Sequence, residues 1–164
     1  MPIIDLQAKK LRENAVVPKY AHGKEDSGMD LFVASVATRD KDKKFVESEE
    51  AILKPGEVAL AKTGWAFAIP VGFEMQIRPT SGNSLKTKIR IPNAPGTIDA
   101  GYRDEVGVII ENIGNENIEI KAGDKIAQAV IAPIYWANII EADELPVSRR
   151  DKNGFGSTGV LGKK

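Results

Sequence analysis

The stretch Trp65-Ala-Phe-Ala-Ile-Pro-Val-Gly-Phe-Glu-Met-Gln-Ile-Arg78 decides the fold class, because it holds two strand-like runs separated by a turn. Trp65–Ile69 and Phe73–Arg78 are short and rich in aromatic and aliphatic residues, a composition that favours β-strands. Pro70-Val-Gly72 between them is a turn signal. Proline cannot donate a hydrogen bond to a neighbouring strand, so Pro70 predicts the end of the first run.

Runs of the same texture continue toward both ends of the chain, each bounded by Gly, Pro or Asn. No segment keeps a helical period beyond two turns, and we expect one short helical turn at Ser84–Lys88 and a weak helix at Asp5–Leu11. The pattern predicts an all-β fold, a sandwich or a barrel. The further strands expected are Leu31–Ala34, Val58–Lys62, Ile89–Ile91, Val106–Asn112, Asn117–Ile120, Lys125–Ile134 and Asn138–Glu141.

Length and composition exclude several classes of protein. The 164 residues, 42% of them apolar, suffice for one domain with its own core. No apolar run approaches the ~20 residues of a membrane helix. Lys plus Arg (23) balance Asp plus Glu (23), so neither nucleic acid nor a membrane is expected as a partner.

The counts of cysteine and histidine limit the chemistry. Without cysteine there is no disulfide, no thiolate nucleophile and no Cys-ligated metal. The single histidine, His22, excludes a His-rich metal site and disfavours a Ser-His-Asp triad. The first residues lack the basic and apolar regions of a signal peptide, so a cytoplasmic setting is expected.

Two segments differ from the rest of the chain. Nine of the twelve residues of Arg39–Glu50 are charged, which predicts a solvated loop or hairpin tip, with a partner-binding arm as the alternative. Residues 148–164 are Gly-rich and basic, and their composition is typical of a disordered tail. Within them, Arg150 and Phe155 among glycines equally suit a segment that wraps around an anionic ligand with a planar base. We therefore divide the chain into a domain at 1–147 and an arm at 148–164.

Two loops carry residues that suit phosphate chemistry. In Ala94-Pro-Gly-Thr-Ile-Asp-Ala-Gly-Tyr-Arg-Asp-Glu105, the Pro-Gly and Ala-Gly pairs place Asp99 at a hairpin. Asp99 either only hydrogen-bonds its own turn, or its ionised carboxylate takes a proton from a water that attacks phosphorus. Arg78-Pro-Thr-Ser-Gly-Asn-Ser-Leu-Lys86 offers hydroxyl and backbone N–H donors to phosphate oxygens, although taken alone such residues are more typical of an ordinary loop.

Five segments, in one order, resemble the motifs of the trimeric all-β dUTPase family, and the resemblance spans roughly Ala21 to Gly159. Each motif is weak by itself, but the shared order and spacing are specific. The segments are Ser27-Gly-Met-Asp-Leu31, Pro79-Thr-Ser-Gly82, Asn93-Ala-Pro-Gly-Thr-Ile-Asp-Ala-Gly-Tyr-Arg103, Gly123-Asp-Lys-Ile-Ala-Gln128 and Gly154-Phe-Gly-Ser-Thr-Gly159.

The resemblance implies a jelly-roll-like subunit in a homotrimer with three active sites shared between subunits. The second and fourth segments would come from one subunit, the third from a neighbour and the 148–164 arm from the third. The implied reaction is hydrolysis of dUTP to dUMP and pyrophosphate with Mg²⁺, which keeps uracil out of DNA and supplies dUMP for thymidylate synthesis. A bacterial, phage or viral source is equally compatible.

The resemblance also assigns roles to residues. Asp99 would activate the water that attacks the α-phosphate, and Tyr102 would lie under the deoxyribose and reject a 2′-hydroxyl. Asp30 would act on Mg²⁺ indirectly, through water, with the metal held mainly by the triphosphate. The implied substrate-binding set is Thr80, Ser81, Gly82 and Gln128 at the phosphates, Asn93, Gly96, Thr97 and Ile98 at the uracil edge, Tyr102 at the sugar, and Arg150, Phe155, Gly156, Ser157 and Thr158 closing over the ligand.

Two other interpretations and one departure stay open. Family members commonly carry Arg or Lys where this chain has Thr80, and alternation would point Arg78 to the same face. The related dCTP deaminases carry a Glu where Ile109 stands, so deamination would lack its base. A nucleotide-sensing or protein-interaction module without turnover is the other alternative, and a protein partner would bind at the 39–50 insertion.

Overall fold

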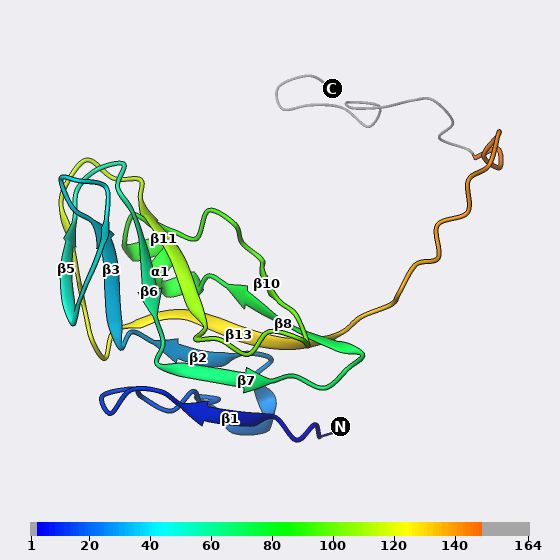
Figure 1. The fold of residues 1–164 in the computed structure, drawn as a ribbon, viewed down its shortest axis with the longest axis horizontal. Coiled ribbons are helices and arrows are strands. Elements are labelled where there is room, and N and C mark those ends of the chain that lie inside the picture. The colour runs from blue at the N-terminus through cyan, green and yellow to red at the C-terminus, as the bar shows by residue number, and fades with distance from the viewer. Residues whose placement is uncertain (1–2, 149–164) are drawn as a thin grey trace.

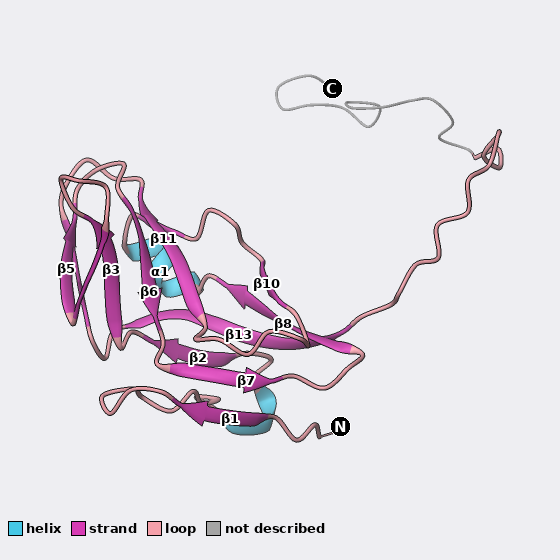
Figure 2. Ribbon diagram, in the orientation of Figure 1, coloured by secondary structure: helices cyan, strands magenta, loops and turns pink. Residues whose placement is uncertain are grey.

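The computed structural model describes residues 3–148, and these form two packed β-sheets with one short α-helix beside them (Figures 1 and 2). Within these residues no helix has the length and apolar character needed to cross a membrane. The elements in chain order are β1 Gln7–Lys10, the 3₁₀ turn η1 Gly23–Glu25, β2 Met29–Phe32, β3 Ser35–Arg39, β4 Phe45–Ser48, β5 Glu50–Leu53, β6 Val58–Lys62, β7 Trp65–Ala68, β8 Phe73–Arg78, α1 Ser81–Lys86, β9 Ile89–Arg90, β10 Gly96–Ile98, β11 Gly107–Asn112, β12 Ile118–Lys121 and β13 Lys125–Pro133.

The two main sheets are built from antiparallel pairs. One has four strands in the order β10-β8-β13-β2, and the other has five in the order β4-β3-β6-β11-β9. Two-stranded sheets of β1 with β7 and of β12 with β5 complete the described β-structure. The expected all-β, jelly-roll-like fold is confirmed.

In β8 and β11 the core is built from alternate residues. Met75 and Ile77 of β8 are at most 3% exposed, as are Val108 and Ile110 of β11. Successive side chains of a strand point to opposite faces, so residues between these, such as Gln76, face away from the core. The outward face of β8 is therefore free to carry polar groups.

The stretch that decides the fold class forms β7 and β8, as expected. The two strands do not pair with each other, because β7 pairs with β1 while β8 pairs with β10 and β13. The turn between them is closed by a hydrogen bond from Phe73 N to Pro70 O (3.2 Å), and Gly72 has a φ of 94°, which glycine adopts without strain. The turn thus carries the chain from one sheet to another.

Two sequence predictions are wrong. Asp5–Leu11 is not a helix, because Gln7–Lys10 pairs as β1 with the open edge of β7, a tertiary contact that outweighs weak local helix preference. Its four exposed residues include two lysines, which are typical of an edge strand. Asn138–Glu141 is not a strand, since the chain leaves the sheets after β13 and no described strand pairs with it (Figure 1).

Four strands, β3, β4, β5 and β10, were not predicted from the sequence. In β4 all four residues are exposed, so no apolar alternation marks the strand. The charged 39–50 segment is a hairpin, as predicted, in which β4 pairs with β3 around a tip at residues 40–44. The helical turn expected at 84–88 starts earlier, as α1 (Ser81–Lys86), because the Thr80 side chain caps it.

Residues 134–148 run away from the sheets (Figure 1). Ile134 N still donates to Gly72 O at 2.9 Å, but the aromatic residues that follow are almost fully exposed, Tyr135 at 95% and Trp136 at 99%. Ile139, Ile140, Leu145 and Val147 are at least 80% exposed. The segment therefore presents several large apolar side chains to solvent.

Candidate active site

The predicted phosphate-binding residues lie where β8 ends and α1 begins. Thr80 is 8% exposed and caps α1, its hydroxyl accepting from Asn83 N at 3.4 Å. Ser81 and Gly82 follow in the first turn of the helix, and both are exposed or half-exposed. This end of the sheet therefore presents a hydroxyl and backbone amides to solvent.

Gln128 lies beside this turn, on the outward face of β13. Its side-chain Nε2 donates to Pro79 O at 2.9 Å. Its neighbours across the sheet are Asp30 on β2 and Arg78 on β8, so the three residues form one row. A Cβ on Gly28 would lie 2.6 Å from Gln128 Oε1, so a glycine is required there for the Gln128 side chain to keep its place.

The structure explains why a threonine stands at position 80, where the resemblance leads one to expect Arg or Lys. Arg78 is exposed and donates to Gln76 Oε1, whereas Thr80 is buried as a helix cap. The expectation that both side chains share a face is wrong, because the strand ends at Arg78 and alternation does not continue past Pro79. Arg78 is the cation within this row, where it pairs with Gln128 across the sheet.

Asp99 and Tyr102 lie in the loop that follows β10. Tyr102 N donates to Asp99 O at 3.0 Å, which closes the predicted turn, and the Asp99 side chain is exposed. The Tyr102 hydroxyl donates to Glu105 O at 2.9 Å. Burial, with the nearby charges of Asp104 and Glu105, raises the Tyr102 pKa, so the phenol is neutral at physiological pH.

The strand before this loop brings the predicted uracil-reading residues together. Gly96, Thr97 and Ile98 form β10 and pair with β8. A Cβ on Gly96 would lie 3.1 Å from Asn93 Nδ2, so the amide of Asn93 packs closely on the strand. A backbone edge with an amide beside it offers paired donors and acceptors, which is what recognition of a planar base edge requires.

Asp99 and Ser81 lie at opposite ends of β8, whereas Gly96 pairs with Ile77 close to the α1 end. Ile98 pairs with Met75 near the start of the strand, and Asp99 follows it, whereas Ser81 lies beyond the end of the strand. At about 3.4 Å per residue, this separates Asp99 from Ser81 by roughly 20 Å along the sheet. One copy of the chain therefore does not bring the predicted base and the predicted phosphate donors to the same α-phosphate.

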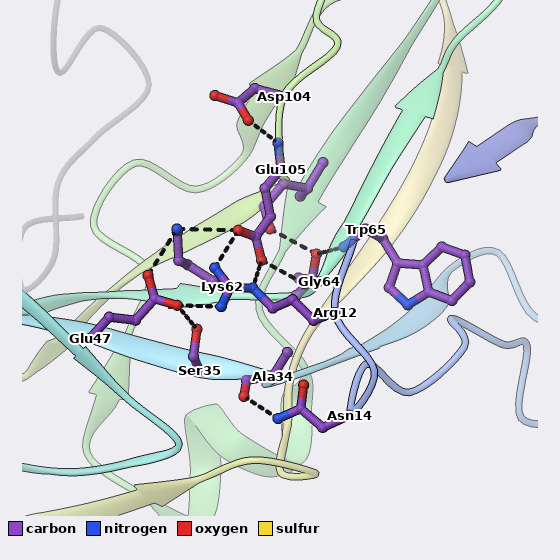
Figure 3. Close-up of polar contacts among 12 residues, drawn as sticks. Arg12, Asn14, Ala34, Ser35, Glu47, Lys62, Gly64, Trp65, Asp104 and Glu105 are labelled. Carbon is purple, nitrogen blue, oxygen red and sulfur yellow. Dashed lines mark hydrogen bonds and ion pairs between the residues drawn. The ribbon is translucent and has the colours of Figure 1, made fainter. Parts of the chain in front are cut away.

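An ionic anchor that the sequence analysis missed holds the Asp99 loop (Figure 3). The Glu105 carboxylate accepts from Arg12 Nε (2.6 Å) and Nη2 (2.8 Å), from Gly64 N (2.8 Å), and pairs with Lys62 Nζ at 3.2 Å. Burial alone would raise the pKa of Glu105, but these donors lower it below its usual value. Arg12 lies 93 residues from Glu105 in sequence, so no local pattern could have predicted the pair.

The remaining predicted residues lie near Gln128 or outside residues 3–148. Asp30 pairs with Lys125 Nζ at 3.2 Å, at the phosphate end. Within residues 3–148, no three His, Cys, Asp or Glu side chains converge to hold a metal. Arg150, Phe155, Gly156, Ser157 and Thr158 lie outside the described residues.

Comparison with known proteins relates these features to one family. The family model described as dUTPase matches residues 45–159. The deoxyuridine 5′-triphosphate nucleotidohydrolases of Clostridium tetani and Nautilia profundicola are each 46% identical over 154 residues, covering 94% of this chain and 96% and 98% of those proteins.

Solved structures agree with the sequence relatives. A mutant dUTPase of Staphylococcus bacteriophage 80alpha with dUpNHpp has a TM-score of 0.79 and 33% identity, covering 95% of this chain and 99% of that chain. A mutant dUTPase from phage phi11 of S. aureus, described with a structural Mg(II) ion, has a TM-score of 0.72 and 30% identity, covering 86% of this chain and 98% of that one.

Proposed function

This chain belongs to the dUTPase family, and we propose that it hydrolyses dUTP to dUMP and pyrophosphate with Asp99 as the group that activates water. The observation that carries the proposal is the exposed Asp99 carboxylate in a turn closed by Tyr102, directly after the strand that offers its backbone edge. The role of the reaction is to remove dUTP before it enters DNA and to supply dUMP.

The chemistry assigned to Asp99 is general-base catalysis. Its carboxylate takes a proton as the water oxygen forms a bond to the α-phosphorus, and the bond from that phosphorus to the bridging oxygen of the β-phosphate breaks. Pyrophosphate leaves with the bridging oxygen. Ser81, the backbone of Gly82, and Gln128 hold the phosphate oxygens, where fixed donors stabilise the developing charge.

Selectivity for the base and the sugar is assigned to the residues around the nucleoside part of dUTP. Asn93 and the β10 backbone pair with the uracil edge, and a cytosine there leaves buried donors or acceptors unpaired. Tyr102 lies under the sugar and excludes a 2′-hydroxyl by contact. Rejection of the thymine methyl by packing alone is worth only about 1–3 kcal/mol, so the wall of the pocket must be rigid.

The separation of Asp99 from Ser81, roughly 20 Å along the sheet, supports a site shared between copies of the chain. We infer a homotrimer in which Ser81 and Gln128 of one subunit face Asp99 of a neighbour, and the 148–164 arm of the third closes the site. The nearly complete exposure of Tyr135 and Trp136 supports the same arrangement, because a second copy would cover them. A single mass of one chain by light scattering would count against it.

Magnesium fits the donors present at the phosphate end. Mg²⁺ usually takes one or two carboxylates together with substrate phosphates and keeps several waters. Asp30 is the carboxylate in the row with Gln128, and it would act on the metal through water. When bound with the triphosphate, Mg²⁺ would neutralise phosphate charge.

The cytoplasmic setting expected from the sequence stays a prediction.

The competing interpretations differ in what the structure offers them. For deamination, the position expected to carry a Glu is Ile109, an apolar residue on β11 opposite Leu60. For a protein partner, the 39–50 hairpin exposes Phe45 by 63% and Val46 by 51%. A partner role beside catalysis is the second candidate, tested by Phe45→Ser with Val46→Ser. These changes should leave dUTP hydrolysis intact and abolish partner capture.

The deciding experiment is pyrophosphate release from dUTP with Mg²⁺, with dCTP, dTTP and UTP alongside. Release from dUTP alone is expected, and Asp99→Asn should lower kcat by about 10²–10⁴. Asp104→Asn is the matched control, because it changes a second carboxylate of the same loop. Tight dUTP binding without release would overturn the proposal and leave a nucleotide-gated binding module.

A further inference from the structure

The loop that carries Asp99 and Tyr102 is fixed at Glu105 by both its main chain and its side chain. The carbonyl of Glu105 accepts the Tyr102 hydroxyl at 2.9 Å, and its carboxylate is bound by Arg12, Lys62 and Gly64 N. The next residue, Val106, is fully buried, and its backbone pairs with Thr63 and Trp65. Glu105 thus joins the exposed turn to the core.

The cations that hold Glu105 are themselves held by the charged hairpin (Figure 3). Glu47 of β4 pairs with Arg12 Nη1 and with Lys62 Nζ (3.0 Å), and accepts from Ser35 Oγ at 2.7 Å. Two cations and two carboxylates therefore close a neutral four-membered network, and each cation bridges both carboxylates. Such a network holds geometry better than a single exposed pair.

Burial shows which member of the network is fixed most firmly. The Glu105 side chain is 9% exposed, whereas those of Arg12, Lys62 and Glu47 are 26–34% exposed. A nearly buried carboxylate with three partners has one orientation, and the Arg12 contact is a two-point fork. The backbone carbonyl that the Tyr102 hydroxyl contacts belongs to this same residue.

We propose that Glu105, held by Arg12 and Lys62, is a positioning residue that fixes the Tyr102 ring and thereby sets the preference for a 2′-deoxyribose. The inference rests on the proposed function, because it assumes that Tyr102 lies under the sugar. A Tyr102 ring free to shift by a fraction of an ångström admits a 2′-hydroxyl, and such misplacement also slows the reaction on dUTP.

The Glu47 contacts also change how the hairpin should be tested. Deleting residues 39–50 would remove Glu47 and leave Arg12 and Lys62 with half of their partners. Lost activity after that deletion would report on the site and not on a protein partner. Changes at Phe45 and Val46 avoid this confusion.

The test compares kcat/KM for dUTP and UTP in the full-length protein, wild type against Glu105→Gln. We expect the dUTP value to fall on the order of tenfold and the ratio of dUTP to UTP to fall by a similar factor. Glu111→Gln is the matched control, because Glu111 forms an Arg–Glu pair with Arg90 in the same sheet, away from the loop. Glu111→Gln should leave kcat/KM for dUTP and the dUTP-to-UTP ratio unchanged.

Readouts separate positioning from folding and from the proposed function. Arg12→Lys keeps the charge of Arg12 and loses its two-point contact with Glu105, so it should lower the dUTP-to-UTP ratio of kcat/KM by a smaller factor. This variant tests the inference independently if Glu105→Gln fails to fold. A folded Glu105→Gln or Arg12→Lys variant with the wild-type dUTP-to-UTP ratio would overturn this inference alone. No dUTP release from the wild type would overturn the proposed function instead.

Discussion

The two ends of β8 hold their candidate site residues in different ways. At the α1 end, Ser81 and Gln128 are placed by a helix cap and by hydrogen bonds within one sheet and its adjoining loop. At the other end, the Asp99 loop is anchored by Glu105 to Arg12 and Lys62, which come from other parts of the fold. The first combines a cap contact within three residues with a contact between Gln128 and Pro79, 49 residues apart. The second is an ion-pair network whose contact between Arg12 and Glu105 spans 93 residues.

Under the proposed function, the two ends have different tasks. Phosphate binding needs donors near a surface, which a short turn supplies. Discrimination of a sugar and positioning of a base need a loop held to within a fraction of an ångström, which a turn alone does not provide. The two ends lie roughly 20 Å apart in one chain. They can therefore act on the same substrate molecule only if neighbouring copies bring them together.

Mixing inactive variants tests that condition and carries the largest expected effect. Asp99→Asn and the double variant Ser81→Ala with Gln128→Ala should each be strongly impaired. If each site takes its two ends from different subunits, random mixed trimers restore about a quarter of the sites. Dissociation and reassembly of the mixture, followed by pyrophosphate release, measures this. Activity no higher than the mean of the two variants would mean that one chain holds the whole site.

Trp136 tests whether a second copy covers the exposed segment after β13. Burying an aromatic side chain is worth about 2 kcal/mol, so Trp136→Ser should raise the concentration needed for assembly at least about 30-fold. Sedimentation velocity over a dilution series measures it. Val71→Ser is the control, because Val71 is 94% exposed in a turn of the body. Unchanged assembly of the Trp136 variant would remove this segment from the interface.

Acid unfolding tests how much the charge of Glu47 stabilises the anchored end. Burial would raise the Glu47 pKa, but Ser35, Lys62 and Arg12 lower it from 4.5 to about 2. A depressed folded-state pKa gives stability that is present above pH 4.5 and is lost as the pH falls toward 2. The gap in urea midpoint between wild type and Glu47→Gln should therefore close across that window. A gap that stays constant would mean that the charge of Glu47 contributes nothing.

The smallest effect is expected at the other end, at the cap of α1. Thr80→Ala removes the acceptor for Asn83 N, and loss of an N-cap costs about 0.5–2 kcal/mol. The 3.4 Å length of this bond places the expected loss near the lower limit. Thr80→Ser should retain the cap. If Thr80→Ala weakened dUTP binding without lowering the free energy of unfolding, Thr80 would be a ligand-binding residue and not chiefly a helix cap.

Local chemistry explains which features were predictable. The turn at Pro70–Gly72, strands such as β8 and β11, and the Asp99–Tyr102 turn follow from residue types within a few positions of each other. The sequence order of the motifs also indicated the family. Edge strands such as β1 and β4 were not predictable as strands, because their residues are exposed on both faces and only a partner strand defines them.

The all-β class, the motifs and the candidate residues Asp99, Tyr102 and Gln128 were predictable from the residue pattern, since these depend on short-range signals. Only the tertiary structure decided that Thr80 is a buried cap, that Asp99 and Ser81 lie at opposite ends of β8, and that Arg12 and Glu47 support the Glu105 loop. The physical reason is distance along the chain. Pairings such as Arg12 with Glu105, 93 residues apart, exist only after the sheets have packed.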